Sequence, residues 1–313
     1  MVECSVIIVN WNGGETILNC LRSLHRFEKA GALEIIISDN GSTDGSPSAI
    51  EKEFPAARVL RNGHNHGFAG GVNRGLAHAT GKYALILNPD MEFIEPGLEK
   101  LLGTLDADPA IGLCGCVVLN ADGSFMKQCR RGYPDPLTAL YKVTGLSALF
   151  PQSAAMAKYF YGGAPEDAPL AVDAVSGSFM LARRDALKKA GGLGEEYFMY
   201  VEDVDICKKV RQAGYRVMYL PLMKIMHHGG ACVGKRERRG AFYHYHMTRS
   251  HIVLYAKDRM VAGGGIGWHI AFALILLRYA LLSLIHFNMK FPAHVAEFFA
   301  IHAGNIGPAR HET

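Results

Sequence analysis

The chain up to residue 90 repeats one pattern of hydrophobic and polar positions. Short runs of β-branched and aliphatic residues alternate with stretches whose apolar residues recur at helical spacing. The runs predict buried strands, and the helical spacing predicts amphipathic helices. Strands that alternate with helices predict an α/β fold with a doubly wound, mostly parallel sheet and helices on both faces. The predicted strands are residues 4–9, 34–38, 58–60 and 84–87, and the predicted helices are 16–27 and 72–79.

A polar or glycine-rich segment follows each of these strands. Asn10 follows the first strand, Asp39 the second, the glycine-rich loop 65–75 the third, and Asp90 the fourth. The carboxyl ends of parallel strands share one edge of a sheet, where open α/β sheets bind ligands. Loop glycines let the backbone approach a ligand, and the helix N-terminus that follows favours an anion. The glycine spacing matches neither the dinucleotide fingerprint nor a P-loop. We predict that a nucleotide lies along this edge.

The segment Asn88-Pro89-Asp90 presents an amide and a carboxylate at the end of a core strand. Pro89 cannot donate to a sheet ladder, so the strand ends there. Such a turn is common at strand ends and by itself indicates no function. Oxygen ligands on a rigid strand end also suit Mg²⁺ or Mn²⁺ bound together with substrate phosphates. The polar segments at the neighbouring strand ends favour the cation.

The second half of the chain is less regular. A strand is predicted at 111–118, and the proline-rich segment 130–170 is predicted to be irregular. The apolar run 172–181 predicts a strand with Ser176-Gly177-Ser178 inside it, and a glycine there indicates a bulge or a close ligand approach. A further strand is expected at 215–220, ending near Pro221.

Two polar groups in this half are candidates for chemistry. Glu202 and Asp203 begin a predicted helix, where acidic residues are commonly just dipole partners, although a carboxylate there could also act as a general base. His227 and His228 follow the last predicted strand beside a pair of glycines. A single histidine is usually structural, but one at this place could complete a metal site.

Composition excludes several classes of protein. The net charge of +4 is too small to indicate nucleic-acid binding, and 49% hydrophobic with 20% charged residues excludes wholesale disorder. The seven cysteines have no C-x-x-C pair, so we expect small buried hydrophobes in a reducing compartment. We expect no signal peptide, because the start of the chain lacks a basic region and residues 4–9 form a strand. The cysteines are Cys4, Cys20, Cys114, Cys116, Cys129, Cys207 and Cys232.

The C-terminal part carries a long apolar stretch. Between Arg259 and Lys290 the only charged residue is Arg278, and the predicted helix covers 266–289. About 20 apolar residues suffice to cross a bilayer. A mid-bilayer arginine costs roughly 2.5–3.5 kcal/mol, so attachment in the membrane interface ranks above spanning, and a core helix ranks third. The basic cluster upstream could meet anionic lipid heads; it comprises Lys235, Arg236, Arg238 and Arg239.

Together these segments resemble the family 2 glycosyltransferases, in particular the rhamnosyltransferase-like branch that builds bacterial surface polysaccharides. Each segment is a weak signal alone, but seven in the family's order are a strong one. The resemblance covers roughly residues 4 to 235. The matching segments are 5–12, 39–45, 65–75, 88–90, 176–181, 202–205 and 227–230.

The resemblance implies a GT-A fold, a nucleotide-diphosphate sugar donor and Mg²⁺ or Mn²⁺. Asp39 would hold the pyrimidine base, Asp90 would ligate the metal with His227 as second ligand, and Asp203 would be the catalytic base with Glu202 beside it. His228 fits the family's pattern less well. Asn88 replaces the usual first acid of the metal motif, and an amide is the weaker ligand. The implied donor-binding residues are Val9, Asn10, Asn12, Asp39, Asn40, Gly67, Gly70, Gly71, Asn73, Asn88, Asp90, Ser176 and Gly177.

The chemistry that follows is a single in-line displacement with inversion, since one base and one metal-stabilised leaving group suffice. The expected donor is dTDP-rhamnose and the expected acceptor a glycan or polyprenyl-linked hydroxyl. Two alternatives stay open: a membrane-attached glycan- or nucleotide-binding module that has lost catalysis, and transfer of another hexose from a UDP-sugar. A sugar-1-phosphate nucleotidyltransferase is disfavoured, because no Arg- or Lys-ended glycine loop follows the first strand.

The expected organisation is a GT-A domain at 1–235 and a C-terminal helical, membrane-associating segment at 236–313. The first domain would divide into a nucleotide-binding half, 1–125, and an acceptor half, 126–235. We expect the protein at the cytoplasmic face of the inner membrane, with a soluble cytoplasmic protein as second choice, and we expect no nucleic-acid partner.

Overall fold

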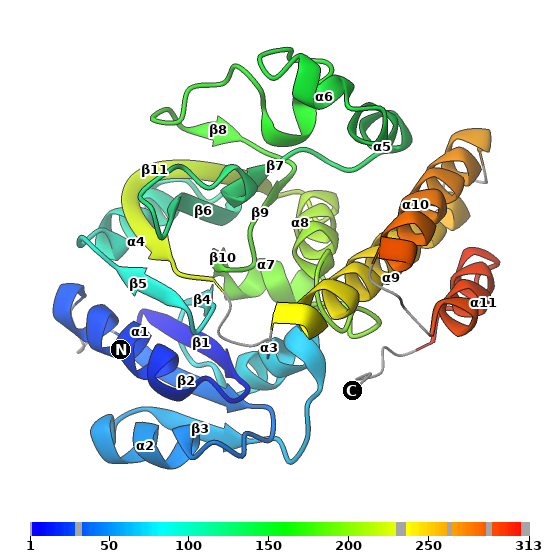
Figure 1. Ribbon diagram of the computed structural model, residues 1–313. Coiled ribbons are helices and arrows are strands. Elements are labelled where there is room, and N and C mark those ends of the chain that lie inside the picture. Colours follow the sequence, from blue (N-terminus) through cyan, green and yellow to red (C-terminus); the bar gives the residue numbers. More distant parts are fainter. Residues whose placement is uncertain (1, 29–32, 230–235, 262–264, 286–289, 308–313) are drawn as a thin grey trace. The chain divides into compact units, whose positions relative to one another are not determined.

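The fold is built around a mixed β-sheet. The computed structural model describes residues 2–28, 33–229, 236–261, 265–285 and 290–307 (Figure 1). The strands of the sheet are β1 (Cys4–Asn10), β2 (Leu33–Asp39), β3 (Arg58–Arg61), β4 (Tyr83–Leu87), β5 (Met91–Phe93), β6 (Ile111–Asn120), β8 (Leu170–Ala171), β10 (Phe179–Arg183) and β11 (Arg216–His227). Within these residues the strand order is β3-β2-β1-β4-β10-β6-β11-β5, and β8 pairs with β11. Two short strands, β7 (Arg130–Arg131) and β9 (Ala174–Val175), pair separately.

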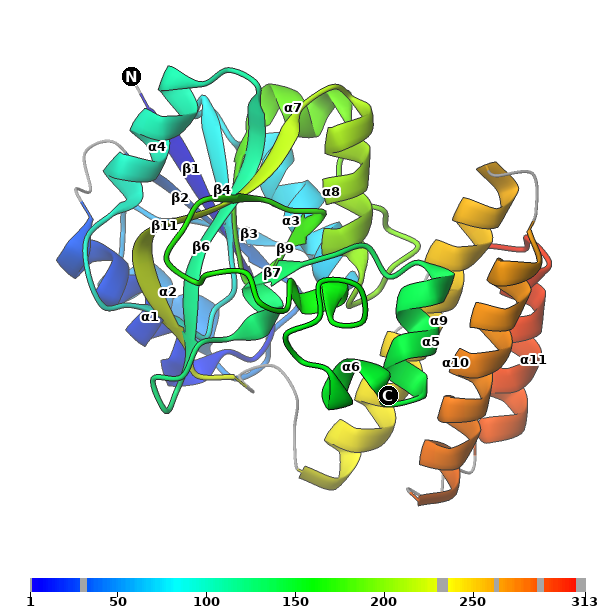
Figure 2. The same cartoon turned by 90° about the horizontal axis from the view of Figure 1, so that it is seen from above.

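Helices cover both faces of this sheet. Figure 2 shows α1, α2 and α4 on one face and α3, α7 and α8 on the other. Their bounds are α1 (Gly14–Phe27), α2 (Ser46–Glu53), α3 (Gly67–His78), α4 (Leu98–Ala107), α7 (Arg184–Lys189) and α8 (Glu202–Gln212). The remaining helices are α5 (Pro136–Val143), α6 (Leu146–Leu149), α9 (Arg236–Val261), α10 (Ile266–Ile285) and α11 (Phe291–His302).

The parallel part of the sheet follows the predicted pattern. β2, β1 and β4 pair in parallel, and β3 pairs in parallel with β2. All seven residues of β1 and all five of β4 are buried, as the continuous apolar runs predicted. The α/β class is therefore confirmed, and β4 is a core strand that ends directly before Asn88.

The other half of the sheet is mixed rather than parallel. β10 lies antiparallel between β4 and β6, and β5 pairs antiparallel with β11. The expected single strand at 172–181 is two strands, β9 and β10, separated at Ser176–Ser178. β11 does not end near Pro221 but continues to His227. A register shift between Tyr219 and Lys224 accommodates the proline, which cannot donate to the ladder.

The segment predicted as the glycine-rich loop 65–75 is mostly helix, because α3 begins at Gly67. Two of its glycines face the sheet. A Cβ on Gly75 would lie 2.4 Å from Ile7 Cγ2, and one on Gly71 would lie 2.7 Å from Val9 Cγ1. The glycines therefore allow a helix to pack closely on β1, a tertiary requirement that outweighs glycine's poor helix propensity.

The chain clusters into two compact units that interleave along the sequence. Unit 1 comprises Met1–Arg131, Pro165–Leu193 and Asp203–Cys232, and it holds the main sheet. Unit 2 comprises Gly132–Ala164, Gly194–Glu202 and Val233–Thr313. The segment expected to be irregular, 130–170, contributes α5 and α6 to unit 2, where α5 packs against α10.

Some predictions fall outside the described residues. These are Cys232, Lys235, the side chains of Arg236, Arg238 and Arg239, and the last part of the predicted helix, 286–289. The six cysteines that the structure describes are all free and buried, as expected. Among the described residues one helix, at Ile266–Leu284, is long and apolar enough to cross a membrane, and 28% of that window is buried in the protein.

Candidate active site

Asn10 and Asp39 stand side by side at the carboxyl ends of β1 and β2. The Asn10 amide donates to the Asp39 carboxylate over 2.8 Å and to the Ser46 hydroxyl over 2.9 Å. Ser42 donates its hydroxyl to Asp39 over 2.6 Å and its N–H over 3.1 Å. Asp39 is 2% exposed, so these neutral donors stabilise a carboxylate that water scarcely reaches. The group is fixed in orientation at the predicted nucleotide edge.

The loop after β2 is tied to the start of α1. The Asp44 carboxylate accepts the Gly14 N–H over 2.8 Å and the Ser46 hydroxyl over 2.6 Å. Partial burial acts to raise the pKa of Asp44, but the hydrogen bonds from Ser46 and Gly14 outweigh it and hold the pKa below its usual value. Asn12, with φ +52°, accepts the Thr43 N–H over 2.8 Å. The loop after β2 is therefore held to the start of α1 by hydrogen bonds and carries the negative charge of Asp44.

Asn40 connects the end of β2 with the start of α3. Its amide donates to the Gly67 carbonyl over 2.9 Å and to the Asn65 side chain over 3.2 Å, and it accepts from Asn62 over 3.0 Å. Asn73, further along α3, exchanges two hydrogen bonds of 2.9 and 3.0 Å with the Leu193 backbone. Asn73 thus has a local structural partner. Gly67, Gly70 and Gly71 are buried in α3.

Asp90 and His227 face each other across the antiparallel pair β5 and β11. His227 Nε2 lies 3.1 Å from Asp90 Oδ1, and the Asp90 carbonyl accepts the His228 N–H over 3.0 Å. Asp90 is 7% exposed. His228 instead contacts Glu92, 2.5 Å away, and both of those side chains are nearly half exposed. The extension of β11 to His227 is what brings this histidine, rather than its neighbour, to Asp90.

The Asp90–His227 pair fits a divalent cation. A buried carboxylate oxygen and an imidazole nitrogen lie 3.1 Å apart and form an oxygen-plus-nitrogen donor set that a divalent cation could use. No group of three or more His, Cys, Asp or Glu residues in the described part of the chain could hold a metal alone. Phosphate oxygens and water would supply the remaining ligands, as is usual for a cation that accompanies a nucleotide.

Asp203 lies at the start of α8 with three hydrogen-bond donors around it. Its Oδ2 accepts from the Gly177 N–H over 2.9 Å and pairs with the Arg131 guanidinium. Its Oδ1 accepts the Val204 N–H over 2.8 Å. The side chains of Asp203 and Arg131 are 11% and 13% exposed. A carboxylate has about four acceptor sites, so these three contacts leave acceptor capacity on Oδ1.

The backbone immediately before α8 is strained. Tyr200 and Val201 have φ values of +70° and +69°, the left-handed region that β-branched residues rarely adopt. Each such residue costs of order 1–3 kcal/mol, and strain of this kind clusters at functional sites. Glu202 follows directly and is buried. The strained pair thus leads straight into the two carboxylates at 202 and 203.

Hydrogen bonds and packing connect the Asp90–His227 pair with Asp203 within unit 1. The Asn88 N–H donates to the Ser178 carbonyl over 3.0 Å, and Ser176 Oγ lies 2.9 Å from Ser178 Oγ. A Cβ on Gly177 would meet the Phe68 ring at 3.2 Å and Asp203 Cβ at 3.4 Å. Phe68 follows Gly67, the partner of Asn40. The structure therefore brings Asn10, Asp39, Asn40, Asn88, Asp90, Ser176, Gly177, Asp203 and His227 into one connected region.

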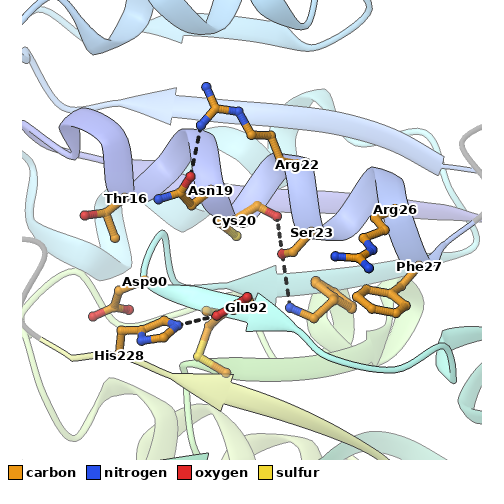
Figure 3. Close-up of a pocket in the computed structure, with 12 residues that line it drawn as sticks. Thr16, Asn19, Cys20, Arg22, Ser23, Arg26, Phe27, Asp90, Glu92 and His228 are labelled. Atoms are coloured by element: carbon orange, nitrogen blue, oxygen red, sulfur yellow. Dashed lines mark hydrogen bonds and ion pairs between the residues drawn. The ribbon is translucent and has the colours of Figure 1, made fainter. Parts of the chain in front are cut away.

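A groove of about 440 Å³ runs between α1 and β5 and ends at Asp90 (Figure 3). Asp90 and His228 form one end, and the face of α1 forms a wall with polar and cationic side chains such as Asn19 and Arg22. Asp90 is thus bordered by open space rather than enclosed. The predicted nucleotide residues on β1 and β2 do not line this groove.

A mixed sheet of this order, with Asp39 and Asp90 at the ends of its strands, is a GT-A fold. Solved structures agree on the fold. A mannosyltransferase from Pyrobaculum calidifontis, in complex with GDP-Man and Mn²⁺, matches 96% of this chain and 75% of its own at 20% identity and a TM-score of 0.54. GalNAc-T7 with UDP, GalNAc and Mn²⁺ matches 73% of this chain and 43% of its own at 18% identity and a TM-score of 0.56.

The chain belongs to glycosyl transferase family 2, whose family model matches residues 5–191. It is similar to the N-acetylglucosaminyl-diphospho-decaprenol L-rhamnosyltransferase of Mycobacterium tuberculosis, at 28% identity over 78% of this chain and 81% of the relative. The low-salt glycan biosynthesis hexosyltransferase Agl10 of Haloferax volcanii is 24% identical over 72% of this chain and 67% of its own. The resemblance to glycosyltransferases of the rhamnosyltransferase branch is confirmed.

Sequence reasoning missed several members of this region. Arg131 lies in a two-residue strand inside a segment predicted to be irregular, and no local pattern distinguishes it from Arg130. Phe68 belongs to the supposed loop. Ser42 and Ser46 could have been predicted from the sequence, because a segment rich in turn-forming residues after a strand commonly supplies hydroxyl partners to a nearby carboxylate.

Proposed function

We propose that this chain is an inverting rhamnosyltransferase. It would move rhamnose from dTDP-rhamnose to a hydroxyl of a lipid-linked glycan at the cytoplasmic face of the membrane. The M. tuberculosis relative, whose name specifies a decaprenol-linked acceptor and L-rhamnose, supports both the sugar and the lipid carrier. The two neighbours solved with Mn²⁺ support a divalent cation.

The observation that carries the proposal is the connected set of Asp90, His227 and Asp203. Asp90 and His227 would hold the cation, which neutralises the charge that develops on the departing nucleoside diphosphate. Oδ1 of Asp203 would accept the proton of the acceptor hydroxyl. At the same time the hydroxyl oxygen would bond to the anomeric carbon, and the bond from that carbon to the diphosphate oxygen would break. Arg131 and the Gly177 N–H hold the other oxygen of Asp203 and so orient it.

The residues proposed to bind the nucleotide-sugar donor lie at the ends of β1 and β2 and at the start of α3. Asp39, fixed by Asn10 and Ser42, would receive the pyrimidine ring, with Val9, Asn12 and Asn40 beside it. The start of α3 at Gly67 and Gly70 would face the diphosphate, since a helix N-terminus favours an anion. Glu202 stays proposed as the second carboxylate beside the base.

The test is donor turnover. Purified protein with Mn²⁺, dTDP-rhamnose and a short lipid-linked acceptor should release dTDP, and Asp203→Asn should lower kcat by roughly 10²–10⁴-fold. Asp173→Asn is a matched control, because Asp173 forms a half-buried ion pair with Arg211 that involves neither Asp203 nor Asp90, and this variant should keep full activity. Undiminished turnover by Asp203→Asn would remove it as the base.

Two further measurements separate the alternatives. Nuclear magnetic resonance of the product should show an anomeric configuration opposite to that of the donor; the same configuration would exclude a single displacement. A panel of nucleotide sugars, scored by thermal shift with Mn²⁺ and then by turnover, distinguishes rhamnose transfer from transfer of another hexose and from binding without catalysis. Turnover of a UDP-hexose would replace rhamnose, and tight donor binding without any turnover would indicate a binding module.

A further inference from the structure

The exposed large hydrophobic side chains of the described residues all belong to unit 2. Unit 1 has none, although it is the larger unit. Apolar residues exposed singly are common on soluble proteins, whereas contiguous apolar surface marks an interaction site. The thirteen residues here are confined to one unit. They are Leu137, Leu140, Leu149, Phe150, Tyr243, Met260, Val261, Ile266, Ile270, Leu277, Leu281, Leu284 and Phe299.

Helix α10 presents its share of these residues as one stripe. The exposed apolar positions recur at spacings of three and four residues, so they lie on a single face of the helix, and the exposed His269 lies at the edge of that face. Leu277 and Leu281 are 54% and 55% exposed, and Leu284 is 73% exposed. Elsewhere on its surface α10 packs against α5, α9 and α11. The stripe comprises Ile266, Ile270, Ala273, Leu277, Leu281 and Leu284.

The one charge of α10 lies off this stripe. Arg278 is half-buried and lies near Tyr243 of α9: partial burial of that phenol raises its pKa, and the charge of Arg278 lowers it by less. No acidic residue occurs from Arg259 to Ala296, whereas Arg259 precedes the helix and Lys290 follows it. An acid-free apolar face between two cations is complementary to a bilayer surface that carries anionic lipids.

We propose that the α10 stripe docks unit 2 on the interface of an anionic bilayer, with the helix lying in the membrane plane. A spanning helix would have to lose its contacts with α5, α9 and α11 and carry Arg278 to mid-bilayer. A core helix would not leave six successive apolar positions of one face in water. The proposal does not depend on the catalytic assignments, because lipid binding is measured without donor or acceptor.

The test is co-sedimentation of the full chain with vesicles of phosphatidylcholine alone or mixed with phosphatidylglycerol. We expect binding to the mixed vesicles and weaker binding to phosphatidylcholine. The charge-neutral variant Leu277→Ser with Leu281→Ser should bind roughly tenfold more weakly or worse, because it removes apolar carbon from two positions of the docked face and puts hydroxyl groups there. Unchanged binding by this variant overturns the assignment.

The control replaces two exposed alanines of unit 1, Ala56→Ser with Ala107→Ser, and should bind as the unchanged chain does. Circular dichroism and thermal unfolding of both variants establish that each is folded. If the unchanged chain does not bind vesicles but forms a dimer that the leucine variant disrupts, the stripe is a subunit interface and the proposal is wrong. Alkaline carbonate should release membrane-bound protein; retention in the pellet would indicate a spanning helix instead.

Discussion

The close packing of α3 on β1 leads to a sharp prediction for Gly75. Replacing it by alanine places a Cβ 2.4 Å from Ile7 Cγ2, whereas carbon atoms pack best at about 3.5–4.0 Å. Ile7 is fully buried in a central strand and its β-branched side chain is stiff, so helix and strand must move apart by about 1 Å. Overpacking of this kind costs about 1–3 kcal/mol. The better helix propensity of alanine returns only about 0.5–1 kcal/mol.

Gly103 is the matched control for this substitution. It lies inside α4, and a Cβ there would meet nothing within 4 Å. Gly103→Ala should therefore stabilise the protein by about 0.5–1 kcal/mol, whereas Gly75→Ala should destabilise it by roughly 1–2 kcal/mol. Urea denaturation followed by circular dichroism measures both. For a chain of this size 1 kcal/mol corresponds to about 2–4 °C in Tm, so the two variants should differ by several degrees.

The result that would refute this reasoning is equal stability of the two variants. If Gly75→Ala were as stable as Gly103→Ala but had lost affinity for a nucleotide sugar, the glycine would serve a ligand, as the sequence pattern alone predicted. Loss of stability together with unchanged donor affinity in the folded fraction would establish the packing role.

Three further outcomes are expected. Arg131→Ala should lower kcat at least tenfold with little change in KM, and Arg131→Lys should restore part of it, because the guanidinium orients the Asp203 carboxylate; misfolding would also lower apparent kcat at constant KM, so circular dichroism must show Arg131→Ala to be folded, and a folded variant with unchanged kcat would remove the role. His227→Ala should raise the Mn²⁺ concentration for half-maximal turnover by roughly tenfold or more, while His228→Ala, which removes only the contact with Glu92, should not. Burial raises the pKa of the Cys4 and Cys207 thiols to about 12, so the unfolded chain loses protons first above pH 9 and stability, measured by urea denaturation from pH 8 to 10.5, should fall as pH rises.

The local pattern of apolar residues was sufficient to predict the parallel strands in the N-terminal half of the chain. β1 and β4 are continuous apolar runs whose ends carry polar residues, so both the strands and the position of Asp39 and Asp90 followed from the sequence. The antiparallel direction of β10 did not, because it depends on pairing Phe179 with Leu87, and nothing near residue 179 specifies that partner. Arg131 was missed for the same reason: its partner Asp203 lies 72 residues away.

The start of α3 shows how local propensity misleads. Four glycines between 67 and 75 are typical of a loop, yet the helix runs through all of them. Gly71 and Gly75 leave room for the sheet residues Val9 and Ile7, and Gly67, at the start of the helix, has a φ of +73° that favours glycine. The extension of β11 past Pro221 has a similar origin. A break in the ladder at one place is tolerated when the strand regains its partner β6 beyond it, at Lys224 to His227.

The interleaving of the two units limits how this protein can be divided. The chain passes from one unit to the other after residues 131, 164, 193, 202 and 232. A recombinant fragment that stopped near residue 235 would keep α5 but lack α10, the helix against which α5 packs. Such a fragment would expose the apolar side of α5 to water and would tend to aggregate. The two units are therefore better separated by point substitution than by truncation.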